Sequence, residues 1–223
     1  VSTITGDVEV MVPDIASAYK SRMKVADLSS KEEIAIFDRA KKDVEESGIV
    51  FENDFSVVEL QMEAPTLDDT MPDNERLVWA LQAAAGVEKV RLTYQVLKKL
   101  PDVLRDNGFR VNAVCRKSGH GVLVYDILPP EDRRICGAAI DIGTTTVSAV
   151  ILDMESGELL AKASAGNGQI RYGADVINRI IESTKEGGRE KLQKAIIEET
   201  INPMLRNMCR ASKLDGSRIY HMC

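Results

Sequence analysis

The segment from residue 135 to residue 153 reads ICGAAIDIGTTTVSAVILD. It contains two apolar runs, Ile135–Ile142 and Val147–Leu152, which are separated by Gly143 and a run of threonines. Apolar runs of this length, bounded by a turn former, predict β-strands, and the short polar interval between them predicts a hairpin. The remaining elements can be placed outward from this hairpin.

The residue types at the predicted turn favour binding of a phosphate group. Gly143 lets an anion approach without a Cβ in the way, and successive amide N–H groups from Gly143 to Thr146 can converge on one phosphate oxygen. The hydroxyls of Thr144, Thr145 and Thr146 add further donors. Asp141 would repel a phosphate, but a Mg²⁺ ion held through its water shell resolves that conflict. The pattern therefore predicts a nucleotide–Mg²⁺ site, although an ordinary hairpin with Asp and Gly as turn formers has the same residues.

Downstream of the hairpin the pattern alternates between strand and helix. A third strand is predicted at Leu159–Ser164, helices at Ala174–Ser183 and Lys191–Met208, and the start of a fourth strand at Ile219–Met222. Pro203 falls inside the second helical pattern and should kink it. No Walker-type Gly-x-x-x-x-Gly-Lys-Ser/Thr string occurs, so the predicted phosphate site is of a different design.

Upstream of the hairpin a smaller α/β unit is predicted at 49–132, and it ends at a Pro-Pro-Glu-Asp segment. Its strands are predicted at Phe55–Met62, Val87–Leu92, Phe109–Cys115 and Gly121–Leu128, and its helices at Asp73–Gly86 and Leu97–Gly108. Residues 1–48 read as a linker segment with a strand at Asp7–Val12 and a charged helix around Ile34–Val44, which Gly48 ends. The predicted divisions are thus 1–48, 49–132 and 133–223.

Composition excludes several classes of protein. The chain has 29 basic and 35 acidic residues and only 4% aromatic residues, so neither a basic field nor a stacking platform for nucleic acid is expected. No segment has the length and apolarity of a membrane span. The cysteines, Cys115, Cys136, Cys209 and Cys223, form no Cys-x-x-Cys pair. This spacing predicts reduced thiols of a cytoplasmic protein and no metal cluster within the chain.

Two stretches carry a resemblance to known proteins. Gly137–Thr146, with Val147–Asp153, resembles the first phosphate motif of the acetate and sugar kinase, heat-shock 70 and actin superfamily. The run from Asn167 through Gln169 to Arg171–Ile180 is similar to the ATP-dependent reductive activators of corrinoid proteins. The fold implied is α/β: a small middle domain, followed by the first part of an actin-like, ribonuclease-H-like ATPase domain that is truncated at residue 223.

The resemblance implies a function, cofactors and a partner. Activators of this family use ATP to reduce an inactive Co(II) corrinoid protein to Co(I), with an electron from a [2Fe–2S] domain that would lie before this chain. Carried over, Asp141 would position Mg²⁺, while Gly143, Thr144, Thr145 and Thr146 would bind the ATP phosphates. The second stretch would place Gln169, Tyr172, Gly173 and Asp175 beside the cleft. The corrinoid protein is the implied partner, and the resemblance leaves room for a homodimer.

Two alternatives stay open at this point. A phosphotransferase like the sugar and acetate kinases would use the same hairpin. Alternatively, residues 1–134 would form a non-catalytic dimerisation or docking module, which fits the excess of 18 acidic over 7 basic residues within 1–75. The superfamily's second phosphate and adenosine motifs do not occur in these residues, and the chain begins with Val1 rather than Met. We therefore expect the 223-residue chain alone to bind ATP weakly and to turn over nothing.

Overall fold

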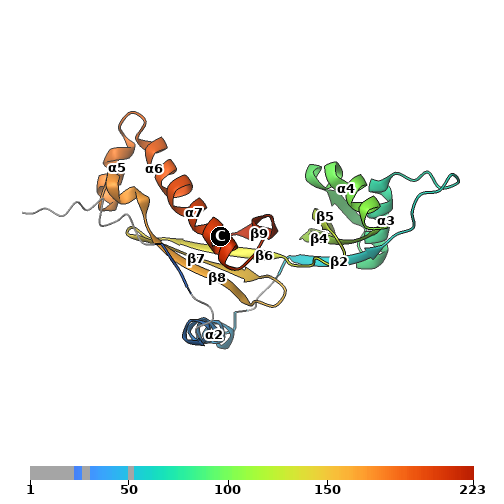
Figure 1. Cartoon of the computed structure of the whole chain (residues 1–223), viewed down its shortest axis with the longest axis horizontal. Coiled ribbons are helices and arrows are strands. Elements are labelled where there is room, and N and C mark those ends of the chain that lie inside the picture. The colour runs from blue at the N-terminus through green and yellow to red at the C-terminus, as the bar shows by residue number, and fades with distance from the viewer. Residues whose placement is uncertain (1–22, 27–30, 50–52) are drawn as a thin grey trace, which may run out of the picture.

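The computed structural model describes residues 23–26, 31–49 and 53–223, and these residues form two β-sheets with helices packed on them (Figure 1). Within that part of the chain, one sheet has four strands and the other has five. Each sheet combines antiparallel pairs with one parallel pair, so the α/β class expected from the sequence is confirmed. The strand predicted at Asp7–Val12 lies outside the described residues.

The four-stranded sheet is built from residues 55–128 and has the strand order β2-β4-β5-β3. Its elements are β2 (Phe55–Gln61), α3 (Asp73–Ala85), β3 (Lys89–Leu92), α4 (Tyr94–Asp106), β4 (Arg110–Ser118) and β5 (Gly121–Leu128). Apolar residues at helical spacing, Leu77 and Leu81 of α3 and Leu100 and Leu104 of α4, are buried against the sheet. This spacing places them on one face of each helix, and both helices therefore cover the same core.

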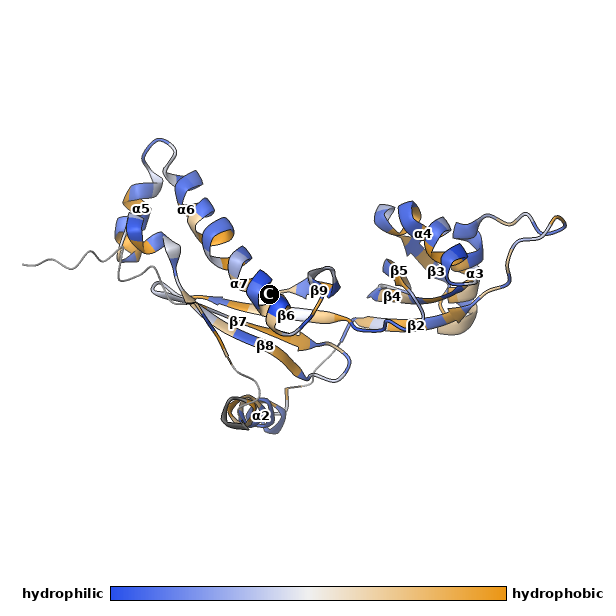
Figure 2. Cartoon of the chain, viewed as in Figure 1, coloured by the Kyte–Doolittle hydropathy of each residue, from blue (hydrophilic) through white to orange (hydrophobic). Residues whose placement is uncertain are grey.

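The five-stranded sheet has the order β1-β8-β7-β6-β9. Its strands are β1 (Lys24–Val25), β6 (Cys136–Ile142), β7 (Thr146–Asp153), β8 (Leu159–Gly166) and β9 (Ile219–Met222). The meander β6-β7-β8 is antiparallel, as the two apolar runs and the third predicted strand indicated, and β9 returns parallel to β6. In Figure 2 the strands are coloured largely as hydrophobic, whereas blue covers much of the helices.

Among the helices between β8 and β9, the last one packs on a face of this sheet. These helices follow the 3₁₀ turn η1 (Gly168–Tyr172) and are α5 (Val176–Ser183), α6 (Gly188–Ile196) and α7 (Asn202–Ala211). Met204 and Met208 of α7 are fully buried and belong to the same core cluster as Val147 and Ala149 of β7. A π-helical segment, η2 (Ile197–Ile201), joins α6 to α7 directly before Pro203. Because proline has no N–H to donate, the break in regular helix predicted at this position is explained.

The helix predicted in the linker segment is present as α2 (Lys31–Glu46), and Gly48 follows it with a φ of 81°. Its residues Ile34, Ile36 and Val44 remain exposed. Figure 1 shows α2 on the side of β7 and β8 that is opposite α7. Among the described residues, no helix has the length and apolarity needed to cross a membrane.

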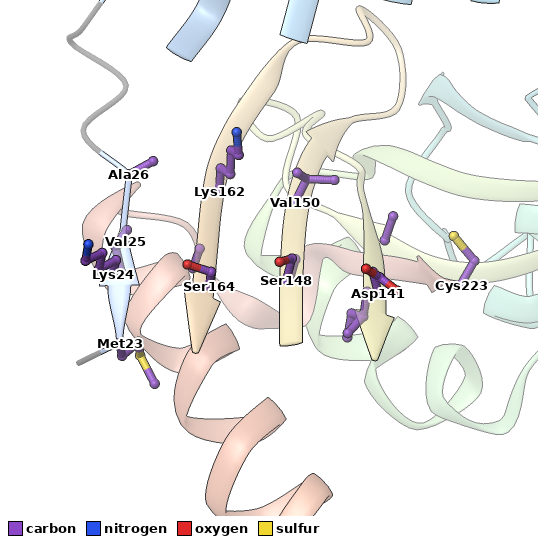
Figure 3. Close-up of a pocket in the computed structure, with 14 residues that line it drawn as sticks. Met23, Lys24, Val25, Ala26, Asp141, Ser148, Val150, Lys162, Ser164 and Cys223 are labelled. Atoms are coloured by element: carbon purple, nitrogen blue, oxygen red, sulfur yellow. The ribbon is translucent and has the colours of Figure 1, made fainter. Parts of the chain in front are cut away.

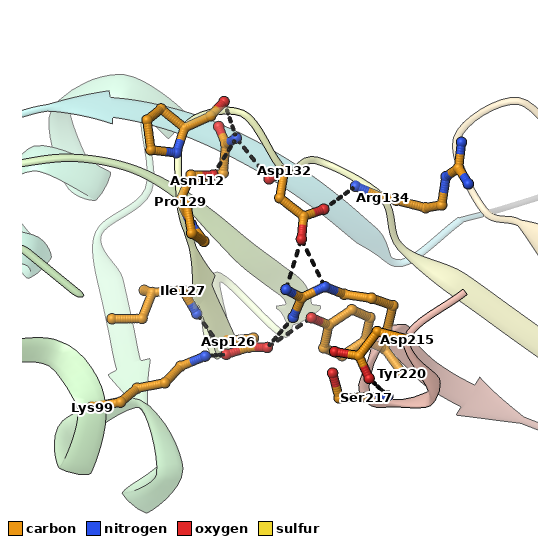
Figure 4. A network of polar contacts seen from close by, with 12 residues as sticks. Lys99, Asn112, Asp126, Ile127, Pro129, Asp132, Arg134, Asp215, Ser217 and Tyr220 are labelled. Atoms are coloured by element: carbon orange, nitrogen blue, oxygen red, sulfur yellow. Dashed lines mark hydrogen bonds and ion pairs between the residues drawn. The ribbon is translucent and has the colours of Figure 1, made fainter. Parts of the chain in front are cut away.

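The two sheets meet at a junction built from apolar and polar contacts. Phe55, Val114, Leu128 and Ile135 form a small buried cluster between them. Beside it, Figure 4 shows a polar network in which Asp126 and Asp132 of the first unit face the η3–β9 segment (η3, Gly216–Arg218) of the second. The junction therefore ties the segment after β5 to the last strand of the chain.

Candidate functional site

The predicted hairpin is present, and its turn is closed by a backbone hydrogen bond. Ile142 of β6 pairs with Val147 of β7, and the N–H of Gly143 donates to the carbonyl oxygen of Thr146 at 2.9 Å. A Cβ on Gly143 would lie 2.6 Å from that oxygen, closer than real Cβ contacts allow. Glycine at position 143 is therefore required by this close approach.

The carbonyl oxygens of Gly143, Thr144 and Thr145 all accept hydrogen bonds from residues of one segment, which runs from Asn167, just before η1, into α5. The side-chain amide of Asn167 donates to the oxygen of Gly143 at 2.9 Å, and the backbone N–H of Asn167 donates to the oxygen of Thr145 at 2.8 Å. Arg179 of α5 donates to the oxygen of Thr144 at 2.5 Å. Each carbonyl dipole of the turn is thereby compensated within the protein.

In contrast to these carbonyls, two backbone N–H groups of the turn are unpaired in the described part of the chain. The N–H groups of Thr144 and Thr145 have no acceptor among the described residues, and both side chains are exposed. Thr146 is also exposed at the start of β7. An unpaired pair of consecutive amides next to free hydroxyls is the donor set that an anion requires. The turn can therefore accept a phosphate oxygen without breaking an existing hydrogen bond.

Asp141 lies two residues before the turn and is also exposed. Its carboxylate has no hydrogen-bond or ion-pair partner among the described residues. It is the end of a polar row across the sheet, in which Asp141 pairs with Ser148, Ser148 with Ser164, and Ser164 with Lys24. Asp141, Ser148 and Ser164 line an open pocket of about 740 Å³. Figure 3 shows these three residues side by side on its wall. Because side chains alternate along strands, this row lies on the face of the sheet that is turned away from α7.

The guanidinium of Arg179 makes two further hydrogen bonds besides the one to the turn. Its Nε donates to the oxygen of Gly173 at 3.0 Å, and its Nη1 donates to the side-chain oxygen of Gln169 at 3.4 Å. Gln169 is in turn fixed because its amide donates to the oxygen of Leu192 in α6 at 3.0 Å. Burial lowers the pKa of Arg179 from its ordinary value, yet guanidinium groups remain charged in proteins.

The four residues predicted beside the cleft therefore separate into two pairs. Gln169 and Gly173 reach the turn indirectly, through Arg179. Tyr172 instead packs under the guanidinium of Arg171, whose carbon lies 4.9 Å from the ring centroid. Asp175 is the N-cap of α5, accepting the N–H of Asn178 at 2.8 Å. Asp175 therefore caps the start of α5.

Asn167 and Arg179 were not singled out by the sequence patterns, although both lie within the stretch that carries the resemblance. Asn167 is 2% exposed, and its Oδ1 also accepts the N–H of Gln169 in the manner of an N-cap. A polar residue before a short turn is a weak signal, and an arginine on an amphipathic helix is usually solvated. Only the tertiary contacts show that these two residues hold the turn.

Cys115 and Cys136 are buried in the cores of the two sheets, whereas Cys223 lines the same pocket as Asp141. Burial raises the pKa of Cys115 to about 12 and, as the largest cause, that of Cys136 to about 11. Both thiols are therefore protonated at neutral pH and unreactive as nucleophiles. Within the described ranges, no group of three or more His, Cys, Asp or Glu side chains could hold a metal ion.

Comparison with known proteins assigns the family. The model of the RACo linker region matches residues 44–133, and the model of the RACo middle region matches residues 136–223. The chain is 35% identical over 130 residues to the corrinoid activation enzyme RamQ of Eubacterium limosum, an alignment that covers 57% of this chain and 21% of RamQ.

A solved structure gives a second, independent comparison. The reductive activator for corrinoid, iron–sulfur protein superimposes with a TM-score of 0.63 at 31% identity, over 81% of this chain and 30% of its own. The chain thus spans less than a third of the length of either relative. Since the two family matches together account for 44–223 apart from Arg134 and Ile135, the chain belongs to the RACo family, of which it carries the linker and middle regions.

Proposed function

We propose that this chain is part of an ATP-dependent activator that reduces an inactive Co(II) corrinoid protein to Co(I). The similarity to two proteins named as corrinoid activators supports this assignment. The electron would come from a [2Fe–2S] domain that is not among these 223 residues, and the corrinoid protein would be the partner. Bound ATP would supply, through its hydrolysis, the free energy for an electron transfer that ordinary cellular donors cannot drive.

We also propose that residues 133–223 are the N-terminal part of an actin-like ATPase domain. The turn at 143–145 follows the carboxyl end of β6, and β6 runs parallel to β9. Open α/β sheets bind their ligands outside the carboxyl ends of parallel strands. The position of the turn in the sheet thus supports a nucleotide site there.

One observation carries the proposal. The carbonyl oxygens of 143–145 all accept hydrogen bonds, whereas the N–H groups of Thr144 and Thr145 have no acceptor among the described residues. In this assignment the N–H groups of Thr144 and Thr145 donate to phosphate oxygens, together with the threonine hydroxyls of 144–146. Asp141 holds a water molecule of the Mg²⁺ ion that the phosphates share. Asp141 is suited to this role because no cation within the described residues neutralises its carboxylate.

The test is Asp141→Asn in the complete activator polypeptide, with ATP-driven Co(II) reduction followed by visible absorption. Because Asp141 is exposed and has no hydrogen-bond or ion-pair partner among the described residues, the variant should keep the melting temperature of the wild type. We expect the rate of ATP-driven reduction to fall at least tenfold, because mutation of a residue that binds a metal ion through its water shell typically lowers activity by that factor. Asp68→Asn, an exposed aspartate in the loop before α3, is the matched control and should leave the rate unchanged.

Three results would contradict the proposal. Undiminished reduction by Asp141→Asn would remove the role of this carboxylate. Phosphorylation of a small acid or sugar by the wild-type protein, without any corrinoid reduction, would favour the phosphotransferase alternative. A docking module without catalysis would show neither ATP-dependent reduction nor phosphate transfer.

A further inference from the structure

The carbonyl oxygens of the turn at 143–145 would repel a bound phosphate unless other residues of the protein hydrogen-bond to them. A peptide turn exposes carbonyl oxygens as readily as amides, and a phosphate near a free carbonyl is repelled. The carbonyls of Gly143 and Thr145 are taken by Asn167, through its side chain and its backbone. The oxygen of Thr144, between them, is the one held by a charged group, the guanidinium of Arg179.

Arg179 is positioned for this contact by two residues, one within η1 and one directly after it, and the first of these is itself anchored to α6. Its Nε is bound by the carbonyl of Gly173, and its Nη1 by the side chain of Gln169, so the planar group is fixed at two edges. Gln169 is anchored in turn to Leu192 of α6. Gly173 allows the close approach of the helix start, because a Cβ there would lie 2.8 Å from the backbone nitrogen of Arg179.

We propose that Arg179 is a positioning residue for the phosphate-binding turn, seated by Gln169 and Gly173. By binding the oxygen of Thr144, it orients the peptide groups of the turn so that the amides of Thr144 and Thr145 face outward, and it reduces the negative potential of the carbonyl. The inference rests on the proposed nucleotide site and gives Gln169 and Gly173 a role that the sequence could not assign.

The experiment uses the complete activator polypeptide with ATP–Mg²⁺ and compares Arg179→Ala, Arg179→Lys and Asp141→Asn. Arg189→Ala is the matched control, because Arg189 is an exposed arginine on the neighbouring α6 with no contact in the described part of the chain. The measurements are KM for ATP and kcat of hydrolysis, each with and without millimolar guanidinium ion, and the melting temperature of every variant.

For Arg179→Ala we expect KM for ATP to rise about tenfold or more, as loss of a hydrogen bond to a charged group implies, with a smaller change in kcat. Guanidinium ion should restore part of the affinity of Arg179→Ala and leave Arg189→Ala unaffected. Arg179→Lys should be intermediate, because an ammonium keeps the charge but cannot reproduce the planar fork that meets three acceptors. If Arg179→Ala does not fold, the KM for ATP of Arg179→Lys is compared with that of the wild type instead.

The outcomes separate this inference from the proposed function. An unchanged KM in both Arg179 variants, with Asp141→Asn impaired, would overturn the positioning role and leave the nucleotide site intact. A lowered melting temperature with wild-type KM and no guanidinium rescue would also overturn it, since that is what a purely structural contact produces. Full activity of Asp141→Asn would instead count against the nucleotide site itself.

Discussion

The hydroxyl of Tyr220 in β9 donates a 2.7 Å hydrogen bond to Asp126 of β5 and thereby joins the two sheets (Figure 4). Asp126 is also paired with Lys99 of α4. Arg218, just before β9, directs two nitrogens at Asp132 at 2.9 and 2.7 Å. The contacts connect the linker-region sheet to the strand that lies next to β6. Since β6 leads into the turn at 143–145, these contacts help to fix the strand that carries the candidate site.

Removal of the Tyr220 hydroxyl should destabilise the chain in a pH-dependent way. Tyr220→Phe should lower the free energy of unfolding by about 1–2 kcal/mol at pH 7. Burial, and then the bond to Asp126, raises the pKa of Tyr220, so the folded chain keeps a proton that the unfolded chain loses near pH 10. The stabilisation is therefore complete below about pH 10 and lost as the pH rises further.

Urea unfolding of the wild type and Tyr220→Phe between pH 7 and pH 11 checks this prediction. The difference between the two proteins should shrink above about pH 10. Tyr94→Phe serves as control, because the side chain of Tyr94 is 74% exposed and has no hydrogen-bond or ion-pair partner among the described residues. A constant difference across the range would show that the hydroxyl contributes through packing alone.

The Arg218–Asp132 pair should contribute more than a surface ion pair. The two side chains are only 18% and 32% exposed, and two nitrogens of Arg218 converge on one carboxylate oxygen. A double-mutant cycle with Arg218→Gln and Asp132→Asn should give a coupling energy of about 1–2 kcal/mol. The same cycle on the exposed pair Lys42–Glu46 should give about 0.3–0.5 kcal/mol. Equal couplings would mean that partial burial adds nothing at this junction.

Gly143→Ala should distort the turn. The added Cβ would meet the oxygen of Thr146 at 2.6 Å, and backbone at this position cannot give way as a flexible side chain can. We expect a loss of about 1–3 kcal/mol in stability, together with weaker ATP binding in the complete activator polypeptide. Gly137→Ala, in β6, is the control, since its Cβ would meet the Met154 side chain at 3.4 Å and the oxygen of His221 at 3.9 Å, both ordinary contact distances. Similar losses in both variants would contradict this account.

The hairpin and the positions of the strands that follow it could be predicted from the sequence, because alternation and apolar runs depend on neighbours along the chain. The two-residue strand β1 could not. Lys24 and Val25 have no strand pattern of their own and become extended only by pairing with Ser164 and Ala163. The π-helical segment before Pro203 was predicted only as a kink, because the proline removes a donor without dictating what replaces it.

In the candidate site too, some residues could be identified from the sequence and others only from the fold. Asp141 and the turn residues are adjacent in sequence, so their chemistry could be predicted from spacing. Asn167 and Arg179 act on the turn from 24 and 35 positions away along the chain, a relationship that exists only in the fold. Gln169 and Gly173 were selected by resemblance alone, and their contacts with Arg179 now supply a physical reason.

Asn167→Asp should reveal how much the turn depends on a donor at this position. The aspartate keeps the oxygen that accepts the N–H of Gln169, but it replaces the amide that donates to Gly143 with a carboxylate facing a carbonyl. At pH 7 we expect a loss of about 2 kcal/mol or more in unfolding free energy, because a buried charge is left beside an acceptor. Burial raises the pKa of such a carboxyl, and the protonated form can donate again. The difference from wild type should therefore narrow between pH 7 and pH 5, whereas Asn167→Ala should show a constant difference; parallel curves for both variants would contradict the donor role.

Thiol labelling should report the opening of the two cores separately. Cys115 lies in the core of the four-stranded sheet at 1% exposure, Cys136 in the core of the five-stranded sheet at 0%, and Cys223 is exposed. Burial raises the pKa of Cys115 and Cys136, so labelling of either requires both opening and deprotonation. With a disulfide reagent at pH 8, followed by mass spectrometry, Cys223 of the 223-residue chain should react at once and the two buried thiols only at the rate of opening. Labelling in 6 M guanidinium chloride, where all four cysteines should react together, provides the reference. Prompt labelling of Cys115 or Cys136 in the folded chain would contradict the packing described for that sheet.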